Sequence, residues 1–541
     1  MLTTITVPVW QRQADSGWRG RSTLRPSRAG GGILSLSGSA KRSLIYLHSY
    51  PGYRRFLAAT RHPEQARQSV WQEIAPLLRQ SELWRGAFRP ELQDYDITTL
   101  EFYRPAIERS LPTGTSLLNQ EPVMFWSQSA GTTGDQKLFP MTQSFRRQFQ
   151  RTVPPMVHGL MRRYPRFLGL PALYFAATDP RERTEAGIEI GFISNYNYRT
   201  IPALMRSQYA FPREVLRDGA TFDRYAPVYA LRGDLSAMFA VTPLSFKRLI
   251  SSIREHRAFI LGSLRGDLPW DPTLPKPAIS RQRLETVSQL LEADDLAFKK
   301  LWPSLEFVCS WKTAVCAAHL REISAYLEGV DTIDAIYSAT EGWITVPVVE
   351  CGGSVVHPGA HIFEFIEVGR DISTRHLLQP WELTPGIRYE VFLTTAMGMV
   401  RYRLCDVVTC TGFFNRAPVI EFAHKSAGVI SLGLVSVSES ELVESLLAAG
   451  IRLQGHWRVG PNATGNGLVL YVDASEPDLD GQLATADAHL RAININYRIY
   501  AGNDTITGLS CSVLPPTHPL WAQGVSHAQS KPVLLIHTCP E

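Results

Sequence analysis

Segments with helical spacing alternate with short apolar runs typical of strands between about residue 44 and residue 425. Apolar side chains recur every three or four positions over residues 56–78, which predicts a helix, and similar spacing predicts helices over 239–253 and 284–301. The run Val123-Met124-Phe125-Trp126 precedes a loop rich in Ser, Gly and Thr, and predicts a buried strand. Because strands separated by helices form sheets that the helices cover, the alternation favours an α/β fold.

A second, smaller unit is predicted to begin near residue 425. Ser438 and Glu441 have the spacing of a capping box, and Gly450 can end the helix that follows. Strand candidates at 458–459, 468–472 and 509–513 accompany a second helical repeat that starts at Leu479. We therefore expect three parts: a flexible basic tail over 1–43, a large domain over 44–424 and a small α/β domain over 425–541.

The net charge of +5 is concentrated in the first 42 residues, where seven Lys or Arg residues accompany a single acid, Asp15. The rest of the chain has nearly equal numbers of basic and acidic residues, so we expect no binding to nucleic acid. Apolar residues make up 44% of the chain and charged residues 19%, which excludes collagen-like, coiled-coil and wholly disordered proteins.

The seven cysteines form no C-x-x-C pair and lack the spacing of a zinc ribbon or zinc finger, so we expect reduced thiols and a cytoplasmic protein. No stretch approaches about 18 uncharged apolar residues, so we expect neither a membrane span nor a membrane partner. His357 and His361 are four residues apart, but Pro358 and Gly359 lie between them. This excludes a helical zinc face and predicts loop histidines.

The segment Ser127-Gln128-Ser129-Ala130-Gly131-Thr132-Thr133-Gly134-Asp135-Gln136-Lys137 concentrates hydroxyls, glycines and a lysine directly after the predicted strand. Glycines allow the backbone to approach a phosphate and turn its N–H groups toward it, and Lys137 can neutralise phosphate charge. The segment differs from a Walker loop because two residues separate Gly134 from Lys137. A loop of this composition can also be an ordinary surface turn.

The order of residues in this loop resembles the S-[SA]-G-T-[TS]-G-x-x-K phosphate loop of adenylate-forming enzymes. Two further motifs follow in the order that this superfamily requires, Tyr337-Ser338-Ala339-Thr340-Glu341 and Tyr402-Arg403-Leu404-Cys405-Asp406. Together with the segments 301–305, 385–391 and 400–418, they resemble the Gretchen Hagen 3 family of acyl-acid amido synthetases. The resemblance extends from about Phe56 to the C-terminus and weakens after residue 425.

The resemblance implies a large adenylate-forming domain, with mixed sheets, flanking helices and a small β-barrel, followed by a small mobile α/β domain. It implies a monomeric ligase that uses ATP and Mg²⁺ to adenylate a small carboxylic acid and then transfers the acyl group to an amine or amino acid, forming an amide. Two alternatives remain open. The adenylate could react with the thiol of coenzyme A or a carrier protein, or the chain could be a degenerate nucleotide-binding homologue.

The resemblance also implies roles for individual residues. Those that would surround the ATP phosphates are Ser129, Ala130, Gly131, Thr132, Thr133 and Gly134, with Lys137 beside them. Tyr337 would lie against the adenine, Thr340 would reach the α-phosphate, and Glu341 would hold Mg²⁺ as a catalytic residue. Asp406 would accept hydrogen bonds from the ribose hydroxyls, with Phe422 and Lys425 nearby at the hinge.

Two further groups of residues acquire roles from the resemblance. Lys531, in Gln529-Ser530-Lys531-Pro532, would be a second catalytic residue that reaches the phosphate when the small domain closes. The cluster Met238, Phe239 and Val241 would lie near the acyl pocket, although packing in the core is an alternative.

The motif residues also have simpler interpretations, and some depart from the family pattern. Glu341 could be a solvated loop acid, Asp406 a turn residue beside Arg403, Tyr337 a half-buried strand aromatic, and Lys425 a surface lysine. Cys405 replaces the usual glycine before Asp406, which would be costly if this position requires a positive φ. Ala130 replaces a common serine, and Lys425 a commoner arginine, which exchanges a planar fork for a point charge.

Overall fold

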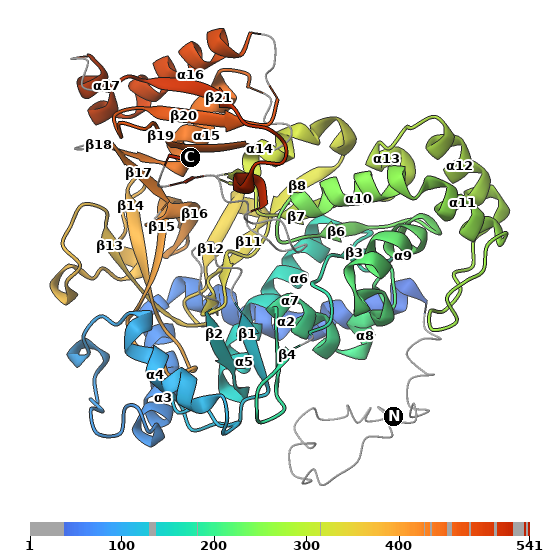
Figure 1. Ribbon diagram of the computed structural model, residues 1–541. Coiled ribbons are helices and arrows are strands. Elements are labelled where there is room, and N and C mark those ends of the chain that lie inside the picture. The colour runs from blue at the N-terminus through green and yellow to red at the C-terminus, as the bar shows by residue number, and fades with distance from the viewer. Residues whose placement is uncertain are drawn as a thin grey trace, which may run out of the picture.

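The computed structural model describes residues 37–128, 137–180, 182–313, 315–426, 428–432, 435–451, 457–474, 478–502, 506–522, 535–536 and 539–540. Helices flank several sheets, which gives the α/β architecture that the sequence predicts (Figure 1). Within these described ranges, no helix is both long enough and apolar enough to cross a membrane.

Two helices form the N-terminal part of the described chain. Helix α2 (Gly38–Arg61) begins after Ser37, whose hydroxyl accepts a hydrogen bond from the Ala40 N–H at 3.2 Å, and α3 (Pro63–Gln80) follows one residue after α2 ends. The helix predicted over 56–78 is therefore divided, because Pro63 cannot donate a hydrogen bond to the preceding turn. Residues 38–43, which we expected in the flexible tail, belong to α2, and most of that tail lies outside the described residues.

A four-stranded parallel sheet has the order β3 (Ala172–Tyr174), β6 (Ala237–Phe239), β7 (Phe307–Ser310) and β8 (Asp331–Asp334). Helices follow its strands, namely α9 (Gly219–Leu231), α10 (Leu244–Glu255), α11 (Arg257–Arg265), α12 (Arg281–Glu292) and α13 (Phe298–Leu301). Met238 and Val308 of the sheet share a buried core with Trp302.

Two of the predicted helices in this region need correction. Phe239 ends strand β6, and helix α10 begins only after Pro243, so the helix predicted from residue 239 starts too early. The segment predicted as one helix over 284–301 contains the end of α12 and all of α13. The two helices are separated near Asp294, whose φ of 52° is left-handed and interrupts the helical backbone.

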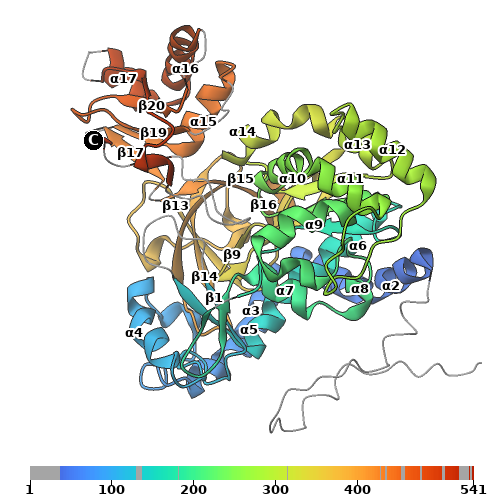
Figure 2. The ribbon, with the colours of Figure 1, turned by 45° about the vertical axis from the view of Figure 1, so that its right-hand side comes forward.

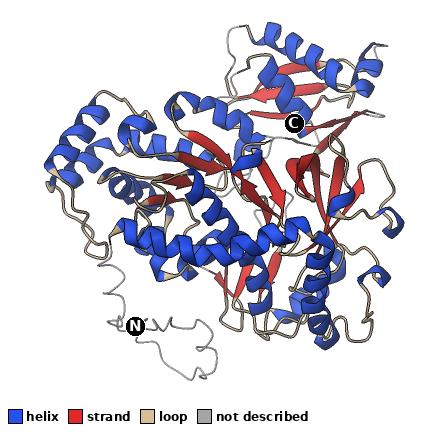
Figure 3. Ribbon diagram, turned by 180° about the vertical axis from the view of Figure 1, so that it is seen from behind, coloured by secondary structure: helices blue, strands red, loops and turns tan. Residues whose placement is uncertain are grey.

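A second, mixed sheet has the order β2 (Leu138–Met141), β1 (Phe125–Gln128), β5 (Glu189–Gly191) and β4 (Glu182–Arg183). Strand β1 corresponds to the buried run predicted around Phe125 and Trp126, and both side chains are buried. The helices associated with this part are α4 (Leu100–Ser110), α5 (Gln143–Phe149), α6 (Val153–Arg163), α7 (Ile193–Thr200) and α8 (Ala203–Arg206). Helix α2 packs against α6. Figure 3 shows from behind how helices cover the sheets on that side of the molecule.

The third sheet carries the third sequence motif, at the start of its strand β15 (Tyr402–Phe414). The order of the sheet is β11 (Thr345–Val348), β12 (Gly353–Val356), β16 (Ala417–Lys425), β15, β14 (Arg388–Thr394) and β13 (Ile362–Glu367), with every adjacent pair antiparallel. In the part of the chain that the structure describes, β11 and β13 are its two edges. The small barrel implied by the family resemblance is therefore corrected to an open six-stranded sheet.

The predicted elements of the small C-terminal unit are confirmed. Ser438 and Glu441 form the capping box of α15 (Glu439–Ala448), and Gly450 has a left-handed φ of 73°. The other elements are β17 (Val429–Leu432), β18 (Val435–Ser438), β19 (Trp457–Pro461), β20 (Leu468–Val472), α16 (Leu479–Ile493), α17 (Ile495–Gly502) and β21 (Leu509–Val513).

Helix α14 (Val315–Glu322) joins this unit to the rest of the molecule (Figure 2). The Arg321 guanidinium donates a hydrogen bond to the Leu447 carbonyl at 2.9 Å, and Cys316 packs within the apolar core of the small unit. The small unit therefore has its own core but rests on a helix of the large part.

Candidate functional site

A bulge in strand β15 determines where Asp406 lies. On the side of β14, Glu390 pairs with Val407 and Phe392 pairs with Arg403, so three residues of β15 face the single residue Val391. Extra residues of this kind bend a strand and re-aim its side chains. The middle residue, Cys405, has a φ of 58°, so the residue that replaces the family's glycine occupies the left-handed region.

Side chains around the bulge fix its backbone. The Arg403 guanidinium donates two hydrogen bonds to the Glu390 carboxylate, at 3.0 and 2.9 Å, and the Ser426 N–H donates to the Cys405 carbonyl at 2.8 Å. Arg403 therefore pairs with Glu390, and Asp406 lies within a strand. The simpler interpretation of Asp406 as a turn residue is excluded.

Asp406 is buried, and two residues far away in the sequence donate hydrogen bonds to its carboxylate. The Tyr337 hydroxyl donates to Oδ2 at 2.6 Å, and the Lys425 ammonium donates to Oδ1. Burial lowers the pKa of Lys425, but the Asp406 carboxylate outweighs this effect and raises it above its ordinary value. Phe422 packs against Tyr337 with ring centroids 5.8 Å apart, so the residues predicted at the hinge adjoin Asp406.

Glu341 lies in the tight turn between β9 (Ser338–Ala339) and β10 (Gly342–Trp343). Its side chain is buried, and the Tyr402 hydroxyl donates a hydrogen bond to Oε1 at 3.3 Å. A β-carbon at Gly342 would lie 3.0 Å from His361 Nε2, which explains a glycine directly after Glu341. Glu341 is therefore a buried acid held by the third motif, and the alternative of a solvated loop acid is wrong.

The electrostatic effects of Glu341 reach the surroundings of Asp406. Burial and the Asp406 carboxylate raise the pKa of Tyr337, and the Glu341 carboxylate adds to that rise. For Lys425, burial lowers the pKa, and the Glu341 carboxylate helps Asp406 to outweigh that effect. Thr340, which precedes Glu341, is half-buried. The second and third motifs, more than sixty residues apart in the chain, therefore converge on one site.

The first motif is described only at its two ends. Strands β1 and β2 pair through Gln128 and Leu138, so the segment between them connects neighbouring strands. Lys137 lies close enough to the bulge to affect the pKa of Cys405, which burial raises and the charges of Lys137 and Lys425 lower. The predicted phosphate-binding residues Ser129, Ala130, Gly131, Thr132, Thr133 and Gly134 lie outside the described residues, and so does Lys531.

The carboxylate at the site suits Mg²⁺ bound together with a substrate phosphate better than a metal ion coordinated only by protein side chains. No cluster of three or more His, Cys, Asp or Glu side chains with the geometry of a metal site occurs among the described residues. Mg²⁺ commonly binds one or two carboxylates together with substrate phosphates and waters. The buried carboxylate of Glu341 fits that pattern as a single protein ligand.

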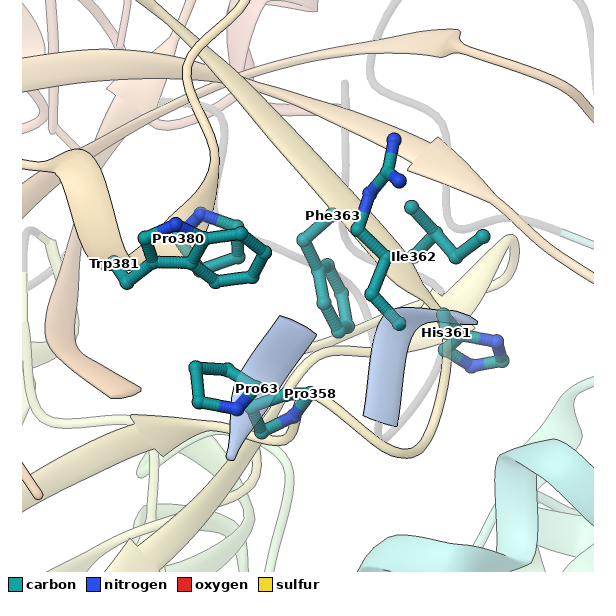
Figure 4. A pocket seen from close by; sticks show the side chains of 8 residues that line it. Pro63, Pro358, His361, Ile362, Phe363, Pro380 and Trp381 are labelled. Carbon is teal, nitrogen blue, oxygen red and sulfur yellow. The ribbon is translucent and has the colours of Figure 1, made fainter. Parts of the chain in front are cut away.

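The histidines that the sequence placed in a loop are indeed outside helices and strands, but they are buried. Burial lowers the pKa of His357 and of His361 to about 3, so both rings are neutral at pH 7. His361 also lines a shallow pocket with Pro63, Phe363 and Trp381 (Figure 4). None of the motif residues lines this pocket.

The cluster expected near the acyl pocket lies at the carboxyl end of β6. Met238 is completely buried in the core of the large domain, and Phe239 packs in a second core against Phe167 and Phe307. Core packing is thus a demonstrated role of Met238 and Phe239, and a role in substrate binding stays a prediction.

Sequence reasoning missed the hydroxyl contacts of the two motif tyrosines. Tyr337 was expected against the adenine, and its hydroxyl bonds to Asp406; Tyr402, the first residue of the third motif, received no role and contacts Glu341. The position of Tyr402 within the motif was the only signal in the sequence.

Comparisons with known proteins identify the family of the chain. The model of the GH3 family N-terminal domain matches residues 52–332, and that of the GH3 family central domain matches residues 354–425. The indole-3-acetic acid-amido synthetase GH3.10 of Arabidopsis thaliana is 27% identical over 382 residues, 62% of this chain and 64% of that protein. The jasmonoyl-L-amino acid synthetase GH3.5 of Oryza sativa subsp. japonica is 25% identical over 398 residues, 65% of this chain and 67% of that protein.

A solved structure has the same fold over nearly the whole chain. The GH3.15 acyl acid amido synthetase in complex with 2,4-DB superposes with a TM-score of 0.76 at 20% identity, covering 95% of this chain and 96% of that chain. The chain spans less than two thirds of the length of the Arabidopsis relative, whereas the N-terminal family model alone covers more than half of the chain. The protein therefore belongs to the GH3 family.

Proposed function

We propose that this protein is an ATP- and Mg²⁺-dependent acyl-acid amido synthetase. It adenylates a small carboxylic acid and transfers the acyl group to an amine or amino acid. The observation that carries the proposal is the convergence of two buried carboxylates, Glu341 and Asp406, from separate motifs, each bonded to a tyrosine of the other motif. The family membership and the names of the amido synthetase relatives support the same activity.

The proposed chemistry explains why the site contains these groups. A free carboxylate is a poor acyl donor because its negative charge repels nucleophiles, whereas a mixed anhydride with AMP has a good leaving group. The Asp406 carboxylate accepts hydrogen bonds from the vicinal ribose hydroxyls and so orients the nucleotide. Lys137 and Lys425 offset phosphate charge from two sides of the site.

The residues 129–134 donate hydrogen bonds to the phosphates, and Thr340 reaches the α-phosphate. Glu341 would hold Mg²⁺. When bound, the cation offsets charge that accumulates on the phosphate oxygens during transfer. These assignments use positioning and electrostatics, which account for most catalysis of phosphoryl chemistry.

We also propose that the small domain, from residue 425 onward, moves relative to the large domain about a hinge at Lys425. Lys425 ends β16 and β17 starts the small unit only a few residues later, which supports a hinge there. Closure would bring Lys531 to the phosphate and exclude the water that hydrolyses an acyl-adenylate. The protein would act as a monomer on small molecules in the cytoplasm.

Acid-dependent exchange of pyrophosphate into ATP tests the adenylation step. The purified protein is incubated with ATP, Mg²⁺, labelled pyrophosphate and a panel of aromatic, aliphatic and hydroxy acids that includes indole-3-acetic and jasmonic acids. We expect exchange with at least one acid and a hydroxamate when hydroxylamine is added. Nucleotide binding without exchange for any acid would instead support a degenerate homologue.

The acceptor is tested with the acid that supports exchange. Amino acids, simple amines and coenzyme A are supplied in parallel, and the products are identified by mass spectrometry. We expect an amide and no thioester. A thioester as the principal product would reject the amido synthetase in favour of an acyl-CoA ligase.

A further inference from the structure

The two motif carboxylates are each held by a tyrosine from the other motif. Tyr337 precedes Glu341 by four residues but donates its hydroxyl hydrogen to Asp406, at 2.6 Å. Tyr402 precedes Asp406 by four residues but donates to Glu341, at 3.3 Å. The two segments therefore exchange hydrogen bonds in a crossed arrangement.

We propose that Tyr402 and Tyr337 are positioning residues, one for the carboxylate that binds Mg²⁺ and the other for the carboxylate that binds the ribose. This inference rests on the proposed function. A phenol has a single hydrogen to donate, so Tyr402 fixes the orientation of Glu341 through Oε1 and leaves most of the carboxylate's lone pairs for a cation. Tyr337 fixes the orientation of the Asp406 carboxylate through Oδ2, while Lys425 donates to Oδ1.

Both hydroxyls act as hydrogen donors in this arrangement. A carboxylate can only accept, so the phenol must supply the hydrogen in each pair.

The backbone and ring contacts of the tyrosines are rigid enough to fix their hydroxyls. Tyr402 pairs with Leu393 in the sheet and packs against Tyr103, with ring centroids 6.0 Å apart. The Tyr103 hydroxyl accepts a hydrogen bond from the Val400 N–H at 2.8 Å, so this second ring is also fixed.

The backbone of Tyr337 is held on both sides. Its N–H donates to the Thr345 hydroxyl at 2.9 Å, and its carbonyl accepts from the Ile344 N–H at 2.9 Å. A displacement of either tyrosine ring would therefore disturb buried structure, whereas removal of the hydroxyl alone would release only the carboxylate. The phenylalanine variants isolate that effect.

The two hydrogen bonds differ in length, which predicts different consequences. The Tyr337 contact has the length of a strong hydrogen bond to a carboxylate, and the Tyr402 contact is longer than the usual O–H···O distance. Loss of an outer partner of a metal ligand typically costs about 10–100-fold in metal affinity or activity, and we expect Tyr402→Phe at the lower end of that range.

The test measures pyrophosphate exchange at varied Mg²⁺ and varied ATP for three variants. Isothermal titration calorimetry of a non-hydrolysable ATP analogue, with and without Mg²⁺, gives the same two affinities independently of activity. Tyr402→Phe should raise the Mg²⁺ concentration for half-maximal exchange about 10-fold and change the KM for ATP at saturating Mg²⁺ less than about 2-fold. Tyr337→Phe should instead raise the KM for ATP about 10-fold and leave the half-maximal Mg²⁺ concentration nearly unchanged. The matched control is Tyr389→Phe, in the same sheet, because the Tyr389 hydroxyl accepts only a backbone N–H, from Thr384 at 2.9 Å.

The outcomes separate this inference from the proposed function. No exchange by the unsubstituted protein with any acid would reject the proposed function and, with it, the inference. Normal exchange by the unsubstituted protein, with Mg²⁺ and ATP dependences in both variants that match Tyr389→Phe, would overturn the inference alone. A rise in both the half-maximal Mg²⁺ concentration and the KM for ATP in each variant would also overturn the inference, because that pattern indicates general damage to the site.

Discussion

Two buried carboxylates of the six-stranded sheet, Glu364 on β13 and Asp406 on β15, have the same exposure but different partners. The side chain of each is 2% exposed. Glu364 is bonded to Arg401, whose side chain is 6% exposed, and also lies 3.6 Å from Arg67, whose side chain is 28% exposed. The cation beside Asp406 is Lys425, whose side chain is 43% exposed. One pair is closed within the core, and the other is open to solvent on its cationic side.

The closed pair also has the more complete set of hydrogen bonds. Arg401 donates from Nε and Nη2 to the two oxygens of Glu364, both at 3.0 Å, and from Nη1 to the carbonyls of Tyr95 and Gln93. A planar guanidinium suits such a fork, whereas the point charge of Lys425 can move without breaking a fixed geometry. The comparison indicates that Glu364 and Arg401 form a closed structural pair, whereas solvent reaches the Lys425 side of the other pair.

The largest expected effect tests the closed pair. Arg401→Ala removes one partner of a fully buried ion pair and should lower the free energy of unfolding by about 3–5 kcal/mol. Lys425→Met should lower it by about 1 kcal/mol or less, because solvent already screens this pair. Chemical denaturation followed by circular dichroism measures both values, and equal losses in the two variants would contradict the comparison.

The next effect concerns the proposed metal carboxylate. Glu341→Gln keeps the size of the side chain but removes the charge, and should lower the rate of pyrophosphate exchange about 100–1000-fold, as expected for loss of a group that stabilises transition-state charge. The melting temperature should stay within a few degrees of that of the unsubstituted protein. Exchange at a near-normal rate would show that Glu341 does not hold the cation.

A smaller effect is expected at the open pair itself. Asp406→Asn keeps two hydrogen-bonding atoms but loses the charged acceptor for the ribose, and should raise the KM for ATP about 10–100-fold. The dependence on the acid substrate should change much less. The matched variant Glu364→Asn should instead lower the free energy of unfolding. An unchanged KM for ATP in Asp406→Asn would show that Asp406 does not bind the ribose.

The smallest effect sharpens the comparison at the backbone. Arg401 and Cys405 both have a positive φ, 45° and 58°, but only Arg401 gains buried contacts that offset the strain. Cys405→Gly should therefore raise the free energy of unfolding by about 0.5–1 kcal/mol, the difference between relieved strain and the greater chain entropy of glycine. Cys405→Ala retains the β-carbon and is the control, and an equal gain from alanine would assign the effect to the thiol.

Local signals in the sequence predicted much of the small unit. The capping box at Ser438 and Glu441, the left-handed Gly450 and the strand at Leu509 all depend on residues within a few positions of one another. The start of α10 was missed because apolar runs of a buried strand and of a buried helix are alike, and the sequence passes from Phe239 to Leu244 through one proline. The division at Pro63 is a local effect that the sequence contains, because proline lacks an N–H to donate, whereas the open edges of the third sheet depend on tertiary packing.

The site was predictable in its membership and less so in its contacts. The motifs identified Tyr337, Glu341 and Asp406, and the structure brings these residues together. The crossed hydrogen bonds could not be predicted, because they depend on the bulge at Cys405 and on the register between β14 and β15. The role of the first motif at Thr133, and that of Lys531, stay predictions.

The central claim is that three segments far apart in the sequence surround one molecule of ATP. A crystal structure with Mg²⁺ and a non-hydrolysable ATP analogue tests it most directly. We expect the ribose hydroxyls about 2.6–3.2 Å from the Asp406 carboxylate, Mg²⁺ about 2.0–2.1 Å from a Glu341 oxygen, and the phosphates against residues 129–134. A nucleotide bound elsewhere, or bound with Glu341 and Asp406 both out of contact with it, would contradict the account.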